Sequence, residues 1–163
     1  MAVTFVRVDD RVIHGQVLTQ WTRVYPCNGI IVVNDNLANN ASLGNVYRGA
    51  APSGIRVYIY TLEKALTKLI EAINSSKKYF LITKSPVELN KLAENGIDFG
   101  KHIIYGPSSY RDDTITIGPN QCLLKEEMDA CEALYNKHIE IEFKLTPDKR
   151  GFKWSDIRNK YYK

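Results

Sequence analysis

The sequence predicts an α/β protein built on an open, mostly parallel sheet of about six or seven strands with helices on both faces. Short runs rich in β-branched and aromatic residues alternate along the chain with segments whose apolar residues have a helical spacing. Several of these runs are apolar throughout, as in strands that a parallel sheet buries on both faces. With 163 residues, 44% of them hydrophobic, the chain is long enough for one core. We therefore expect a single domain over residues 1–163.

The first half of the chain contains predicted strands at residues 3–8, 29–33 and 55–60. Between the first two strands, apolar residues at helical spacing predict a helix over residues 16–24. Residues 34–36 offer side chains that cap a helix. The segment that follows, 37–51, contains two glycines, and only weak helix is expected there.

The second half continues the alternation of strand and helix. Helices are predicted at 62–73, 86–96 and 125–137, and strands at 79–83, 101–105, 114–117 and 139–143. Ser85 and Glu88 form a capping-box pattern around Pro86, and Gly96 suits the end of that helix. The run 114–117 is short and is expected at a sheet edge. The run 139–143 alternates apolar and polar residues, so one face of this last strand should meet water.

The composition limits the kinds of site and location. The three cysteines are odd in number and irregularly spaced, which fits neither a disulfide framework nor a zinc site, and no metal or cofactor is expected. No apolar run approaches the roughly 18 residues of a membrane span. Met1 leads directly into strand-like sequence without a basic and apolar leader, so we expect a cytoplasmic protein.

The net charge of +4 lies in a basic tail, about residues 145–163, which carries six lysines and arginines against two aspartates. The rest of the chain is neutral, which argues against nucleic acid as a partner. An RNA-binding role for the tail is a further reading, and it predicts binding that depends steeply on salt. We expect the aromatic residues of the tail to dock on the body or on a neighbouring subunit, because unsupported aromatic side chains in solvent are unusual.

The turn between the first strand and the first helix contains an excess of charged residues. Asp9, Asp10, Arg11 and His14 lie there within six positions, and Gly15 follows. Ligand sites of open α/β sheets lie beyond the carboxyl ends of the strands, and a helix N-terminus favours an anion. A neutral imidazole is a nucleophile, an arginine binds two oxygens of a phosphoryl group, and a carboxylate orients either one. The residues therefore indicate a histidine that accepts a phosphoryl group.

Simpler readings of the histidines and loops stay open at this point. A single histidine near a helix start is more often a capping or surface residue, with the two aspartates capping the helix and pairing with Arg11. His102 and His138 are interpreted as structural, because their separation from His14 gives no metal-ligand spacing. The loop 108–113 either borders the site or is a solvated turn, and the solvated turn is favoured.

A resemblance to a known family carries the interpretation further. The sequence from Val6 to Val17, with Trp21 four residues on, resembles the signature of the enzyme IIB component of bacterial sugar phosphotransferase systems, in the mannose/fructose/sorbose branch. Residues 30–35, 51–55 and 137–142 are similar to the family's second strand, the turn before its third strand, and its closing strand.

The resemblance implies a phosphocarrier and the roles of its residues. His14 would accept a phosphoryl group on Nδ1 from a phosphohistidine of the IIA component and pass it to a sugar bound by the membrane IIC and IID components. Arg11 and Asp9 would be the charged catalytic positions. Asp10, Gly15 and Gln16 would complete the phosphate-binding loop, without metal or cofactor.

Relatives of this family also suggest a homodimer. The chain departs from the family pattern at Lys84 and Pro107, after the fourth and fifth strands, and both positions are expected near the site. The main alternative is a non-catalytic anion- or nucleotide-binding regulatory module. Against it, the first strand leads into Asp-Asp-Arg and not into the Gly-x-Gly of a dinucleotide site.

Overall fold

The computed structural model describes residues 1–163 and confirms the predicted α/β class. Its main sheet has seven strands in the order β3-β2-β4-β1-β5-β8-β9. Six of them are parallel: β1 (Val3–Val8), β2 (Gly29–Val33), β3 (Arg56–Tyr60), β4 (Tyr79–Thr83), β5 (His102–Tyr105) and β8 (Glu140–Phe143). The short strand β9 (Phe152–Lys153) is antiparallel to β8.

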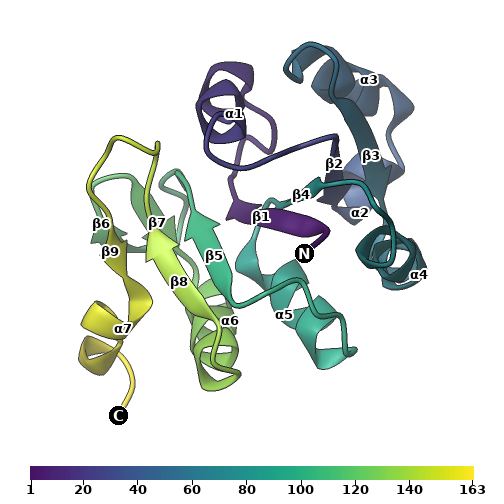
Figure 1. Ribbon diagram of the computed structural model, residues 1–163. Helices are drawn as coiled ribbons and strands as arrows, with labels where there is room; N and C mark the ends of the chain where they lie inside the picture. Colours follow the sequence, from purple (N-terminus) through teal and green to yellow (C-terminus); the bar gives the residue numbers. More distant parts are fainter.

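Helices cover both faces of this sheet (Figure 1). One face packs against α1 (Gly15–Thr22), α2 (Asp35–Ala38) and α3 (Ala41–Ala50), and the other against α4 (Leu62–Ile73), α5 (Pro86–Glu94) and α6 (Lys125–Asn136). Successive strand residues point to opposite faces, so Ile30 and Val32 join one core while Ile31 and Val33 join the other. None of the helices has both the length and the apolar character needed to cross a bilayer.

The expectation of only weak helix in residues 37–51 is wrong. Residues 41–50 form the ten-residue helix α3, and the Asn40 side chain caps it by accepting a hydrogen bond from Leu43 N–H at 3.1 Å. Gly44 is buried where α3 approaches Ile59 of β3. The glycine therefore lets the helix pack closely on the sheet, and that packing outweighs the low helix propensity of glycine.

The run 114–117 was expected to be a short strand at a sheet edge, and it forms a strand outside the main sheet. Residues 115–118 form β6 (Ile115–Gly118), which pairs only with β7 (Gln121–Leu123) in a separate antiparallel hairpin. The strand β7 follows β6 after a two-residue turn, so β6 pairs with its neighbour in the chain and not with a strand of the main sheet.

The basic tail packs on the body of the protein. Residues 152–153 form β9 beside β8, and α7 (Trp154–Ile157) follows, then a short 3₁₀ helix (Arg158–Lys160). Trp154 is fully buried, and its indole N–H donates a hydrogen bond to Glu132 of α6 at 3.0 Å. The strand β8 has the predicted wet face, with Glu140 exposed and Ile141 and Phe143 buried, but it is not the last strand.

Candidate active site

The loop of residues 9–14, here the active loop, joins β1 to α1 at the carboxyl edge of the sheet. Since β1 lies between β4 and β5, this loop is at the middle of that edge. The turn closes with a hydrogen bond from Val12 N–H to Asp9 O at 3.0 Å. Val12 adopts a φ of 59°, which is unusual for a β-branched residue. The side chains of Val12 and Ile13 are buried in the core, and this burial holds the loop in its strained shape.

Asp9 forms a buried ion pair with Arg7, the second-last residue of β1. The exposed fractions of the two residues are 2% and 1%. Arg7 donates from Nε and Nη2 to Oδ2 of Asp9, both at 3.2 Å, and the other carboxylate oxygen accepts a hydrogen bond from the Arg11 N–H at 2.9 Å. Burial raises the pKa of Asp9, and the Arg7 guanidinium opposes that shift. Asp9 therefore orients the backbone of Arg11 and does not contact His14.

Arg11 and His14 face each other across the mouth of the active loop. Nη2 of Arg11 lies 3.2 Å from Nδ1 of His14. A guanidinium group only donates hydrogen bonds, so Nδ1 must be the acceptor and carry the free electron pair. His14 occupies the N-cap position of α1, but its side chain makes no capping hydrogen bond, contrary to the capping alternative. The ring is half-buried, with its nucleophilic nitrogen directed at a cation.

Asp10 fastens a second loop, residues 106–113, to the active loop. Oδ2 of Asp10 accepts a hydrogen bond from Ser109 N–H at 2.7 Å, and its own N–H donates to Pro107 O at 3.2 Å. Arg111 further ties this second loop to the buried Glu127 at 2.8 Å. The two interpretations of this segment both hold in part: residues 109–113 are exposed, as in a solvated turn, and the segment also borders the active loop through Ser109.

The other predicted positions lie around the first turn of α1. Gly15 is its first residue, and a methyl group there would lie 2.6 Å from the carbonyl oxygen of Ala50, so this glycine permits close packing with α3. Gln16 follows and is exposed. Lys84 is also exposed, and with Asp10 it lines a polar pocket of about 380 Å³ beside the active loop.

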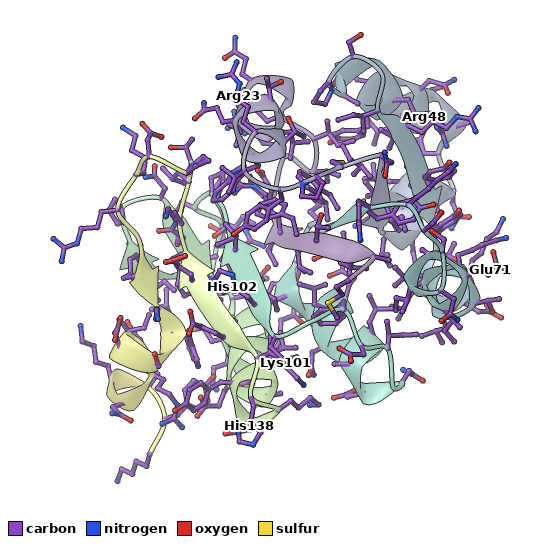
Figure 2. The ribbon with its side chains drawn as sticks, in the orientation of Figure 1. Arg23, Arg48, Glu71, Lys101, His102 and His138 are labelled. Carbon is purple, nitrogen blue, oxygen red and sulfur yellow. The ribbon has the colours of Figure 1, made fainter.

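The other two histidines lie away from the active loop (Figure 2). His102 begins β5, at the opposite end of the strand from the second loop, and its Nε2 is 3.7 Å from carboxylate oxygens of both Glu140 and Glu142. His138 follows α6 and is exposed. The structure brings neither of them together with His14.

Arg7 is the contributor to this site that the sequence reasoning did not single out. It is a cation in a strand that is otherwise almost wholly apolar, two positions before Asp9. Residues two apart in a strand point to the same side, so this spacing was a signal that the two charges pair. The contact between Asp10 and Ser109 had no comparable signal, because 99 positions separate the two residues.

Comparison with known proteins identifies the family of the chain. Residues 3–163 match the family described as the sorbose subfamily IIB component of the phosphotransferase system, or PTS. The chain is 25% identical over 147 residues to the fructose-specific EIIB component of Bacillus subtilis, and covers 90% of each protein. It is 24% identical over 160 residues to the mannose-specific EIIAB component of Escherichia coli, with 98% of this chain and 49% of that relative covered.

Solved structures agree in fold. The IIBSor domain of the sorbose permease from Klebsiella pneumoniae superposes with a TM-score of 0.90 at 24% identity, over 99% of this chain and 98% of that one. The manxB structure from Thermoanaerobacter tengcongensis gives a TM-score of 0.88 at 25% identity, over 99% and 97% of the two chains. Because residues 3–163 match the family model, the chain belongs to the sorbose subfamily of PTS IIB components, in the mannose/fructose/sorbose family, whose role is sugar phosphotransfer.

Proposed function

We propose that this chain is a phosphocarrier that holds a phosphoryl group on Nδ1 of His14. It receives the group from a phosphohistidine of a IIA component and delivers it to a sugar held by the membrane IIC and IID components. The observation that carries this proposal is the 3.2 Å contact between Nη2 of Arg11 and Nδ1 of His14. It supports a nucleophilic electron pair on Nδ1 and a cation beside the position that the incoming phosphoryl group would take.

The proposed reaction consists of two in-line displacements. In the first, the electron pair of Nδ1 forms a bond to phosphorus while the bond between phosphorus and the donor histidine breaks, and the donor nitrogen keeps that pair. In the second, the oxygen of a sugar hydroxyl forms a bond to phosphorus and loses its proton to solvent, while the bond between phosphorus and Nδ1 breaks and Nδ1 keeps that pair. Transition states of this kind need positioning and charge stabilisation more than covalent help.

Two groups of this chain supply that stabilisation. The Arg11 guanidinium moves from Nδ1 to the phosphoryl oxygens, where its planar fork binds two of them. The first N–H groups of α1 precede its first hydrogen bond, which Leu18 N–H donates to His14 O at 3.0 Å, so they are available to an anion. These donors favour phosphate at the start of the helix.

The partners in this proposal follow from the resemblance and from one relative. The name of the E. coli relative joins an A and a B component, which supports a IIA protein or domain as the donor. We place the transfer on the cytoplasmic side of the membrane, where IIC and IID would present the sugar. The proposal also includes a homodimer.

The test is a phosphoenolpyruvate-driven relay that ends with a IIA component and this chain. We expect label that is stable to alkali and labile to acid, on His14 alone. His14→Ala should abolish it, whereas His102→Ala, a change at an exposed histidine beside β8, should leave it unchanged. An alanine variant at position 14 that still accepts label would refute the assignment. An unlabelled wild-type chain that binds phosphate would favour the regulatory module instead.

A further inference from the structure

We propose that Arg7 is a positioning residue for phosphoryl transfer. Through Asp9, its guanidinium holds the active loop in the shape in which Arg11 meets Nδ1 of His14. This inference rests on the proposed function, and it assigns a task to a buried cation that the transfer steps themselves do not use.

The surroundings of Arg7 fix its guanidinium in one place. Nε and Nη2 both donate to the same oxygen of Asp9 at 3.2 Å, and Nη1 donates to the carbonyl of Lys144 at 3.4 Å. The guanidinium carbon also lies 5.9 Å from the centre of the Trp21 ring of α1. The ends of β1 and β8 and the helix α1 thus converge on this one side chain.

The second loop leaves room for this guanidinium. A methyl group on Gly106 would lie 2.5 Å from Nη2 of Arg7 and 2.7 Å from its guanidinium carbon. Gly106 itself is held by its N–H, which donates to Val8 O at 2.7 Å. Only a residue without a side chain fits at position 106 while Arg7 keeps its place.

The contacts lead from Arg7 to the reacting ring in three steps. Arg7 donates hydrogen bonds to one carboxylate oxygen of Asp9, and the other oxygen accepts a hydrogen bond from the N–H of Arg11. The guanidinium of Arg11 in turn contacts Nδ1 of His14. Because Arg7 neutralises Asp9, the guanidinium of Arg11 is not drawn into an ion pair with that carboxylate. It stays available to Nδ1 and then to the phosphoryl group.

The charge of Arg7 is also needed to keep Asp9 ionised. Burial raises the pKa of Asp9, and the attraction of Arg7 is the main effect that opposes it. Without the cation, the buried carboxyl group takes up a proton more readily and is a poorer acceptor for Arg11 N–H. The active loop, which already holds Val12 at a φ of 59°, then loses one of its ties.

Four variants test the proposal: Arg7→Met, Arg7→Lys, Asp9→Asn and the double variant Arg7→Met/Asp9→Asn. In Arg7→Met we expect kcat for phosphoryl uptake to fall by about 100-fold, the scale of a small misplacement of reacting groups. KM for the IIA donor should stay within about twofold, because Arg7 is 1% exposed and cannot touch a partner. Arg7→Lys keeps the charge and should recover part of the loss.

The double variant shows whether Arg7 acts through Asp9. In the Asp9→Asn background, Arg7→Met should lower kcat by less than about threefold, because the two residues form one unit. The ¹⁵N shift of Nδ1 in the unphosphorylated protein gives a second readout that a purely structural role would not change. It should differ from wild type in Arg7→Met, because the contact with Arg11 is lost.

Arg158→Met is the matched control. It breaks the ion pair with Glu132 beneath the tail, far from the active loop, and should lower stability without changing kcat or the His14 shift. A folded Arg7→Met protein with wild-type kcat and an unchanged ¹⁵N shift of His14 Nδ1 overturns the proposal. The proposal also fails if Arg7→Met lowers kcat in the Asp9→Asn background by as much as it does in the wild-type background. If Arg7→Met does not fold, Arg7→Lys and Gly106→Ala give the same two readouts. If the wild-type chain accepts no phosphoryl label in the relay, the proposed function fails. The ¹⁵N shift of Nδ1 in the unphosphorylated protein still tests whether Arg7 positions the His14 ring.

Discussion

Arg11 combines a fixed backbone with a free side chain. Its N–H is held by Asp9, while its guanidinium is exposed and hydrogen-bonds the His14 ring. The residue is thus anchored at one end and able to move at the other. Such an arrangement suits a cation that must follow a phosphoryl group as it arrives and leaves.

Removal of this side chain should slow transfer and leave the fold intact. We expect Arg11→Ala to lower the rate of phosphoryl uptake by about 10²- to 10³-fold, the range for loss of one donor at a developing anion. Because the side chain is exposed, unfolding free energy should change by less than about 0.5 kcal/mol. Arg23→Ala, at the other end of α1, is the control in the same rapid-quench assay. A wild-type rate in Arg11→Ala would remove Arg11 from the site.

At the scale of elements, the position of α1 depends on its contact with α3. The first turn of α1 lies so close to the end of α3 that a methyl group on Gly15 would meet the Ala50 carbonyl at 2.6 Å. Backbone cannot move aside as a side chain does. The glycine next to His14 therefore sets the approach of two helices, and with it the place of the helix N-terminus.

Two glycine substitutions distinguish this packing from helix propensity. Gly15→Ala should destabilise the protein by about 1–3 kcal/mol, because the added methyl group forces α1 away from α3. Gly49→Ala adds the same methyl group to α3, where nothing lies within 4 Å, and should stabilise by up to about 1 kcal/mol. Urea unfolding of both variants measures the difference. Equal effects of the two changes would contradict the close contact.

At the scale of the whole molecule, the tail completes one of the two cores. Trp154 packs against Phe143 of β8 and Tyr162, with ring centres 6.5 and 5.9 Å apart, and it belongs to the core that α4, α5 and α6 cover. Its indole N–H and the Arg158 guanidinium share the Glu132 carboxylate. The basic tail is thus a part of the folded body.

Truncation of the Trp154 side chain should therefore lower the unfolding free energy as much as truncation of a large buried residue in the central sheet. We expect Trp154→Ala to lower the unfolding free energy by about 3–5 kcal/mol, as for large aromatic residues of cores. Tyr161→Ser, at a position 38% exposed, should change it by less than about 0.5 kcal/mol. Thermal unfolding followed by circular dichroism compares the two. A small loss in Trp154→Ala would show that the tail docks only loosely.

The sequence by itself determined the fold class, most of the strands and helices, and the composition of the active loop. These features depend on residues that are neighbours in the chain: period-two and period-3.6 patterns, caps such as Ser85, and the cluster from Asp9 to His14. The meeting of Arg11 with His14 belongs to the same group. Three positions separate these residues, so local geometry brings them together.

Only the tertiary structure decided the contacts that join distant parts of the chain. Asp10 ties to Ser109, Gly15 meets Ala50, and α3 forms despite its glycines because the sheet supports it. No local pattern encodes these contacts, since each depends on how segments that are distant in the chain pack against one another. The sequence thus supplied His14, the proposed nucleophile, and the Arg11 cation beside it, whereas the long-range packing of buried groups decided what holds them in position.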